Sequence, residues 1–379
     1  MKVVITCSPL PGLRAQESTA AAQRAWTDRR PQDEVLAVAV TDGIAMPFVG
    51  SGADEVLAGT DSAQVQLGQA GERHFAHVDA DGVLLDYTSV LAGIPGPGTV
   101  DSSRMVGEDL AWAAAAGHSR ATVLLPVPGS VSDMGTGLLD ALARADDSGA
   151  PEGRESAASD VERLAAARRV LDPLHVSVLV SREQRLLGLS GVARAWMLEG
   201  LDSGQAQNYE RSFADVVAGL SESYAQLPRR SLLAQQSDAA ADPSRNIYAG
   251  AGGGSAFVLN LLGCPIFPVG DAVVRDSLAD AIRGADLLVS VSGQIAEDLP
   301  SCLLAGASLA QEVGIPVVVV YDSGGIRKGE LANLGLNGAY ELRPERSYGQ
   351  EEETAAELAE LPSRLEDLIR RVARTWGWD

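Results

Sequence analysis

The stretch that decides the fold is VLLPVPGSVSDMGTGLLDAL, residues 123–142. A run of apolar residues, typical of a buried strand, meets a Pro-Gly-Ser turn, and the turn opens into apolar positions spaced as on a helix. This is the layout of a strand–turn–helix corner whose backbone N–H groups can hold a phosphate. No Lys, Arg or His lies in the segment. The question is therefore whether the corner handles a phosphorylated ligand or only keeps the shape of one that does.

Strands and helices also alternate on both sides of this corner. Near the start, residues 2–6 and 35–41 are predicted strands around a helix over 15–29, which predicts a parallel sheet. Near the end, predicted strands at 286–291 and 316–321 alternate with helices at 303–313 and 353–374. The segment 65–90 has short alternating runs and an Asp81-Gly82 hairpin signal, which predict antiparallel strands.

The pattern predicts an α/β protein in which one parallel domain is interrupted by a second domain. We place the first domain at residues 1–48 and 265–379 and the inserted domain at 49–264. Residues 145–162 are small, polar and acidic, and we interpret them as an acidic exposed loop.

Composition excludes several functions. The chain has 379 residues and a formal net charge of −21, which repels nucleic acids and anionic membranes. Its two lysines are Lys2 and Lys328, and its three cysteines form no C-x-x-C pair, so neither a zinc site nor a disulfide framework is expected. No apolar run reaches the roughly 18 residues of a membrane span. The predicted location is cytoplasmic.

Seven segments follow one another in the order of a known family. The segments are CSPLPGLRA (7–15), VAVTDG (38–43), VDSSRMVGEDLAWAAAAG (100–117), VPGSVSDMGTGLLDALA (127–143), LVSREQRLLGLSGVARAW (179–196), AGAGGGSAFVL (249–259) and ADLLVSVSGQI (285–295). In these segments the sequence resembles the type I glycerate kinases, two-domain bacterial enzymes that phosphorylate glycerate with ATP.

The resemblance implies a flavodoxin-like parallel-sheet domain carrying an inserted α/β domain, with an active site in the cleft, where open α/β sheets bind ligands. It also implies Mg-ATP as cofactor and a small organic hydroxy acid as substrate, if the protein is active. Compared with the family motifs, charged side chains are missing at seven positions: Cys7, Leu10, Ala45, Met134, Ser292, Gln294 and Ala296. Glycines and small turn residues are kept.

Three acidic residues remain as catalytic candidates, and each has a structural alternative. Asp42 follows a strand, where an Asp often caps a turn. Asp133 is shifted by one position from the family's Asp, and it or Ser132 is also a suitable helix N-cap. Glu183 sits at a predicted strand end, where a solvated carboxylate is ordinary.

The resemblance assigns cofactor contacts to the small residues of the motifs, namely Ser8, Gly43, Gly129, Ser130, Ser132, Gly252, Gly253 and Gly293. Arg327 and Lys328 form a candidate anion site that would replace the family's missing lysine, or else an exposed basic loop. The sequence does not identify metal ligands.

Three hypotheses therefore stay open. The chain is a glycerate kinase-like protein with impaired or lost catalysis, or a working kinase whose charges are relocated. In the first case it keeps the cleft and binds a metabolite, a nucleotide or a protein partner. Alternatively, it is a structural or regulatory protein, or a homo-oligomer, that uses the loop 145–162 or the helix 353–374 as its interaction surface. A dinucleotide-binding oxidoreductase is disfavoured because no G-x-G-x-x-G follows the first strand, and a serine hydrolase because no G-x-S-x-G surrounds Ser130.

Overall fold

The computed structural model describes residues 1–41, 63–67, 74–79, 82–146, 159–228, 242–295, 299–324, 326, 329–344 and 355–378. The chain divides into two compact units. Unit 1 comprises residues 1–60 and 268–379, and unit 2 comprises residues 61–267.

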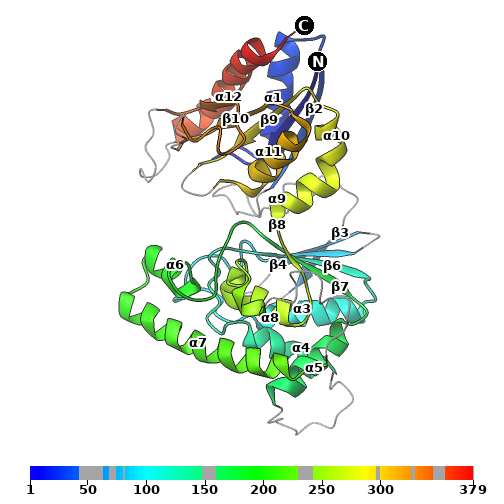
Figure 1. Ribbon diagram of the computed structural model, residues 1–379, viewed down its shortest axis with the longest axis vertical. Coiled ribbons are helices and arrows are strands. Elements are labelled where there is room, and N and C mark those ends of the chain that lie inside the picture. The colour runs from blue at the N-terminus through cyan, green and yellow to red at the C-terminus, as the bar shows by residue number, and fades with distance from the viewer. Residues whose placement is uncertain are drawn as a thin grey trace. The chain divides into compact units, whose positions relative to one another are not determined.

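Unit 1 is built on a five-stranded sheet of order β11-β10-β9-β1-β2 (Figure 1). All of its strand pairs are parallel. The strands are β1 (Lys2–Cys7), β2 (Glu34–Ala39), β9 (Leu287–Ser292), β10 (Val317–Tyr321) and β11 (Gly338–Glu341). β9 and β10 are buried along their whole length, as expected in a sheet covered on both faces, and apart from Ser290 and Ser292 their residues are apolar.

Helices cover both faces of this sheet. The helices α1 (Ala15–Arg29) and α12 (Ala355–Trp376) pack on one face, against side chains such as Ile5 and Val289. The other face carries α9 (Val269–Asp271), a π-helical segment (Ala272–Leu278), α10 (Ala279–Arg283) and α11 (Ser301–Val313). In the chain's own numbering of these five strands the order is 2-1-3-4-5, which is the flavodoxin-like arrangement. The predicted α/β fold class is confirmed.

Unit 2 is built on a six-stranded mixed sheet of order β3-β4-β5-β6-β7-β8. Its strands are β3 (Ala63–Leu67), β4 (His74–Val78), β5 (Val83–Asp86), β6 (Arg120–Leu125), β7 (His175–Val180) and β8 (Ile266–Pro268). β3, β4 and β5 pair antiparallel, whereas β5, β6 and β7 pair parallel. The antiparallel segment predicted over 65–90 is therefore present, and the Asp79 N–H donates to Gly82 O (3.1 Å) where β4 turns into β5.

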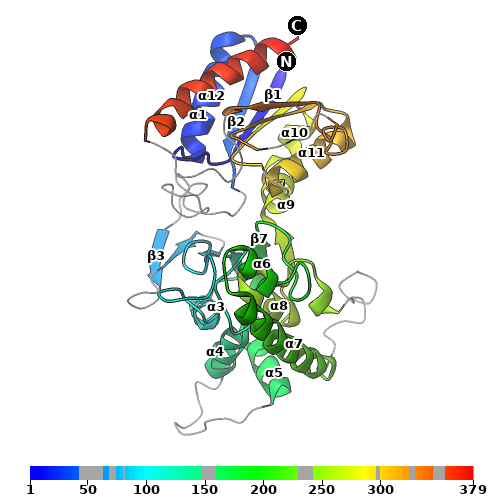
Figure 2. The same cartoon turned by 90° about the vertical axis from the view of Figure 1, so that its left-hand side faces the viewer.

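The helices of unit 2 pack on this sheet around one apolar core (Figure 2). They are α3 (Arg104–Ala115), α4 (Thr136–Asp146), α5 (Asp160–Leu171), α6 (Val192–Leu198), α7 (Ser203–Ala225) and α8 (Ser255–Leu261), with 3₁₀ turns η3 (Pro243–Arg245) and η4 (Ala251–Gly254). Of the predicted acidic loop, residues 145–146 belong to α4 and 160–162 to α5. Residues 147–158 lie outside the described part of the chain.

Candidate functional site

The corner that follows β6 begins α4 through two consecutive left-handed residues. Met134 has φ 53° and Gly135 has φ 80°, a conformation that costs a non-glycine residue energy and persists only where the surroundings enforce it. Here the conformation is held by the burial of the Met134 side chain and by the hydrogen bonds around Asp133.

The Asp133 carboxylate accepts five hydrogen bonds from the protein. Oδ2 accepts from Ser102 Oγ (2.8 Å), Ser103 N (2.9 Å) and Gly137 N (3.3 Å). Oδ1 accepts from Ser103 Oγ (2.9 Å) and Gly135 N (2.9 Å). A carboxylate offers about four lone-pair sites, so the donors of α3 and α4 occupy its accepting capacity. Asp133 fastens the starts of these two helices together.

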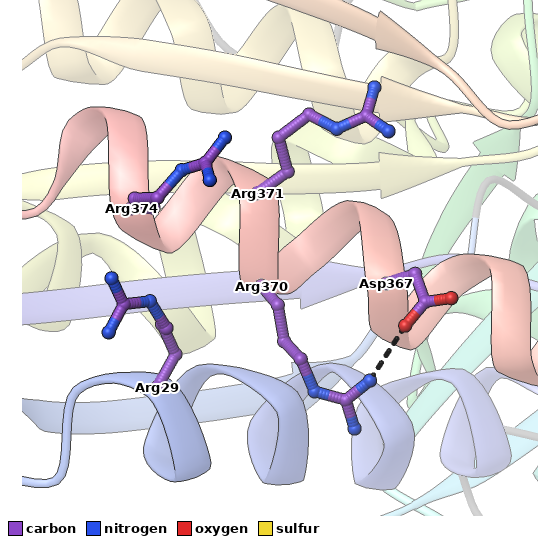
Figure 3. Close-up of a pocket in the computed structure, with 5 residues that line it drawn as sticks. All are labelled: Arg29, Asp367, Arg370, Arg371 and Arg374. Atoms are coloured by element: carbon purple, nitrogen blue, oxygen red, sulfur yellow. Dashed lines mark hydrogen bonds and ion pairs between the residues drawn. The ribbon is translucent and has the colours of Figure 1, made fainter.

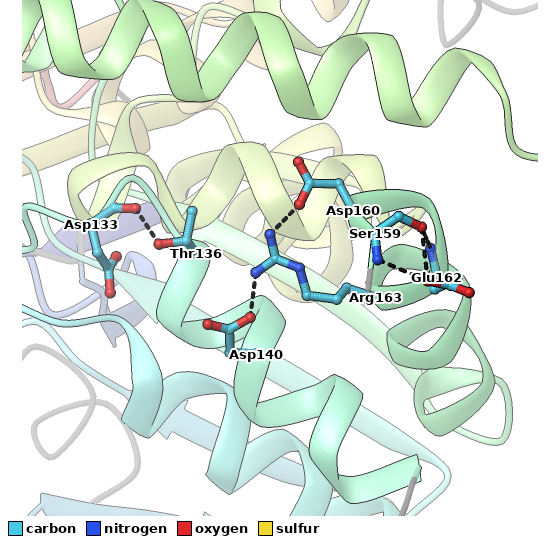
Figure 4. Close-up of polar contacts among 7 residues, drawn as sticks. All are labelled: Asp133, Thr136, Asp140, Ser159, Asp160, Glu162 and Arg163. Atoms are coloured by element: carbon cyan, nitrogen blue, oxygen red, sulfur yellow. Dashed lines mark hydrogen bonds and ion pairs between the residues drawn. The ribbon is translucent and has the colours of Figure 1, made fainter. Parts of the chain in front are cut away.

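The N–H groups at the start of α4 are also satisfied within the protein. The Thr136 hydroxyl donates to the Asp133 carbonyl oxygen (2.8 Å; Figure 4), and the Thr136 N–H donates to the same oxygen (3.1 Å). Leu138 N donates to Ser103 Oγ (2.9 Å). An anion can be held at a helix N-terminus only by N–H groups without other partners, and these groups have partners.

The two serines of the corner face backbone carbonyls. Ser130 is fully buried; its N–H donates to Leu91 O (2.7 Å) and its hydroxyl to Val100 O (2.6 Å). The Ser132 N–H donates to Asp101 O (2.8 Å). Both serines therefore hold the loop that precedes α3 against the corner.

The glycine-rich turn η4 lies directly on this corner, backbone against backbone. A Cβ atom on Gly129 would lie 2.7 Å from Gly252 Cα, and one on Gly253 would lie 2.1 Å from Val131 O. Gly252 N donates to Pro126 O (2.9 Å), and Trp196 Nε1 donates to Gly129 O (2.8 Å). The structure thus brings the predicted glycines and serines of unit 2 together with Asp133. The exposed Glu183 follows β7 between Arg182, which donates to Val127 O (3.3 Å), and Gln184, whose carbonyl accepts from Gly250 N (2.7 Å).

The two described candidates of unit 1, Ser8 and Gly293, lie at the carboxyl edge of its sheet. Ser8 follows β1 and is buried, and its N–H donates to Val291 O (2.9 Å). Gly293 follows the neighbouring strand β9, and its carbonyl accepts from Asp322 N (3.1 Å). Four further candidates, Asp42, Gly43, Arg327 and Lys328, lie outside the described residues, as do Ala45 and Ala296.

Sequence reasoning missed a buried ion pair at this same edge. Asp322 directly follows β10 and Arg343 follows β11, with side chains 0% and 4% exposed. Arg343 donates from Nε to Asp322 Oδ1 (2.6 Å) and from a terminal nitrogen to Oδ2 (2.5 Å), a bidentate arrangement. The available signal is an Asp one residue beyond a run of four valines.

A second missed cluster lies in the core of unit 2. Asp109 Oδ2 accepts the Tyr87 hydroxyl (2.6 Å) and lies 2.6 Å from His74 Nε2. Burial, together with the neighbouring Asp109, raises the pKa of Tyr87 well above its usual range. The three residues come from β4, the end of β5 and α3, so no spacing in the sequence brings them together.

Within the described residues, no group of three or more His, Cys, Asp or Glu side chains is arranged to hold a metal ion. The helices described there also include none that is long and apolar enough to cross a membrane.

A search of curated protein sequences gives no significant match to this chain. Among solved structures, a "putative glycerate kinase 2" from Salmonella typhimurium LT2 is similar to this chain, with 18% identity, a TM-score of 0.67, and coverage of 99% of this chain and 98% of that one. An E. coli heptosyltransferase WaaC with ADP-2-deoxy-2-fluoro heptose shares 10% identity at a TM-score of 0.14, over 98% of this chain and 100% of that one, and carries no argument. The sequence model of the glycerate kinase family matches residues 10–377, and the chain therefore belongs to the glycerate kinase family.

Proposed function

We propose that this chain is a glycerate kinase-family protein in which ATP-dependent phosphoryl transfer to glycerate is impaired or lost. The proposal rests on one observation: the polar groups of the corner after β6 form hydrogen bonds with other parts of the protein. The Asp133 carboxylate and the first N–H groups of α4 are engaged by α3, α4 and the loop before α3. A phosphate or a magnesium ion at this corner would have to displace those hydrogen bonds.

The other described motif positions do not fit Mg-ATP either. Phosphoryl transfer depends on cations around the transferred group and on carboxylates that hold Mg²⁺. Leu10 and Cys7, where the family motif has a lysine and an aspartate, are both fully buried, and burial raises the pKa of the Cys7 thiol to about 12. The Glu183 carboxylate is exposed. Cys7 and Leu10 thus supply neither the carboxylate nor the cation that the family motif has at these positions.

In two alternative functions the protein still binds a ligand. In the first, Asp42, Glu183 and Arg327 or Lys328 share a relocated site, and the substrate is a small organic hydroxy acid. In the second, the chain is a silent scaffold that binds a metabolite or a protein partner, an alternative favoured by the arginine groove described below. In each case we propose a cytoplasmic protein that does not bind nucleic acid, consistent with its charge of −21.

Calorimetric titration with Mg-ATP, alone and with D-glycerate, tests the proposal when the same samples are assayed for ADP. We expect no ADP above that released by a matched sample without glycerate. Glycerate-dependent ADP formation would contradict the loss of catalysis. Asp42→Asn and Lys328→Gln would then show whether the relocated site performs the transfer, with Glu183→Gln as a third variant.

A further inference from the structure

An arginine groove lies between α1 and α12 of unit 1, and none of its lining residues belongs to the kinase-like motifs. Its lining consists of Arg29, Asp367, Arg370, Arg371 and Arg374, and its volume is about 460 Å³. Figure 3 shows Arg370 extending from α12 toward α1 and Arg29 rising from α1 toward α12, whereas Arg371 extends from the opposite edge of α12.

The groove carries excess positive charge in a strongly acidic protein. Arg370 is neutralised, because it pairs with Glu366 (2.9 Å) and Asp367 (2.9 Å). Arg29, Arg371 and Arg374 are exposed, and within the described part of the chain none of them has a carboxylate at ion-pair distance. In a chain of net charge −21, three such guanidinium groups produce a local positive potential that attracts anions.

Helix electrostatics account for only part of this arrangement. Arg29 lies in the last turn of α1 and Arg374 in the last turn of α12, where a cation interacts favourably with the helix dipole. Arg371 and Arg374 are three residues apart on one helix, a spacing at which like charges repel. An anion bound between them converts this repulsion into attraction.

The lining also indicates the chemistry of the ligand. All five lining side chains are charged, so the apolar surface of the groove comes only from their own hydrocarbon stems. Guanidinium groups present planar pairs of donors that match phosphate oxygens bidentately. We propose that this groove binds a compact oligophosphate group, whether free or as the phosphate tail of a nucleotide.

Titration of the full-length protein with inorganic tripolyphosphate at low ionic strength tests the proposal. We expect one bound tripolyphosphate per chain and a Kd at least about tenfold higher in Arg371→Gln/Arg374→Gln, since two charge-assisted hydrogen-bonding groups are removed. The matched control is Arg194→Gln/Arg211→Gln, which removes the same charge from exposed positions on α6 and α7 and should keep the wild-type Kd.

Hydrogen exchange gives a second readout that locates the ligand. Tripolyphosphate should slow exchange at the carboxyl-terminal turns of α1 and α12, and ATP should do the same with similar affinity if only the phosphates are recognised. If ATP binds more tightly than tripolyphosphate, the site is assigned to nucleotides. If the two bind equally, the site is assigned to free oligophosphate. Absence of binding, or equal weakening in both double variants, would overturn the proposal. So would binding of an acidic peptide without binding of tripolyphosphate.

Discussion

Asp133 shows how one side chain can be conspicuous in a motif and yet serve the fold. Its carboxylate meets hydroxyl and N–H donors from the starts of two helices, and all of them point at one group. Charge-assisted hydrogen bonds of this kind are worth more than neutral ones, and the loss of an acceptor leaves several donors unsatisfied.

We expect Asp133→Asn to reduce the stability of the protein by about 2–4 kcal/mol, because the amide replaces one accepting oxygen with a donor that faces other donors. Glu183→Gln is the matched control, since this exposed carboxylate has no such role in the fold. Chemical denaturation followed by far-UV circular dichroism measures the stability of both variants. Equal midpoints for the two variants would show that the hydrogen bonds around Asp133 contribute little.

Cys7 supplies a prediction that depends on pH. Burial is the main cause that raises the pKa of its thiol from 9.0 to about 12, and a hydrogen bond with Thr19 lowers it in part. Between these two pH values the folded chain keeps the thiol proton, whereas the unfolded chain loses it. The contribution of the protonated Cys7 to the stability of the fold is therefore complete below about pH 9 and is lost as the pH rises toward 12.

At pH 8.5 we expect the native protein to react with a thiol reagent far more slowly than the urea-unfolded protein, because all three cysteines are buried and only the thiolate is nucleophilic. Absorbance of the released chromophore measures the reaction. Cys264→Ser/Cys302→Ser reports on Cys7 alone, and rapid labelling of that native variant would contradict its burial.

At the scale of elements, contact between two turns sets the geometry of the corner. Gly129 has no Cβ, and the backbone of Gly252 occupies the space that one would need. We expect Gly129→Ala to destabilise the protein by about 1–3 kcal/mol, because backbone atoms on both sides must move apart. Gly96→Ala is the control, since nothing lies within 4 Å of a Cβ there. Thermal unfolding compares the two, and an unchanged Gly129→Ala midpoint would refute the close contact.

The elements also show what the sequence could predict. The helix α1 begins and ends at the predicted residues, because its apolar spacing marks it clearly. The start of α5 differs from the predicted loop: its composition is small and acidic, but Ser159 and Glu162 form a capping box there and begin a helix. Figure 4 shows Arg163 of this helix between Asp140 and Asp160, which ties α5 to α4.

The candidate site was harder to predict than the elements. The motif glycines could be found from the sequence. The contact between the backbones of Gly129 and Gly252 could not be predicted, because the two turns are more than a hundred residues apart. The pairing of Asp322 with Arg343 joins the ends of two adjacent strands, and it depends on the sheet order. β8 and β11 have only three and four residues, too few for a periodic pattern.

At the scale of the whole molecule, each unit has the parts of an independent domain. Unit 2 has its own core, in which Trp196 and Leu138 are completely buried, and unit 1 has separate cores on the two faces of its sheet. A continuous core and a complete sheet are what a domain needs in order to fold alone. We propose that the inserted segment is such a domain.

Residues 61–268, which include all six strands of the mixed sheet, should therefore fold when expressed alone. We expect a single cooperative urea transition followed by tryptophan fluorescence, since Trp196 passes from a buried to a solvated environment. Leu138→Ala in the same segment should lower the unfolding free energy by about 2–5 kcal/mol, because it leaves a cavity in the core. A gradual transition that Leu138→Ala does not shift would mean that the segment lacks a native core without the rest of the chain, and the proposal of an independent domain would fail.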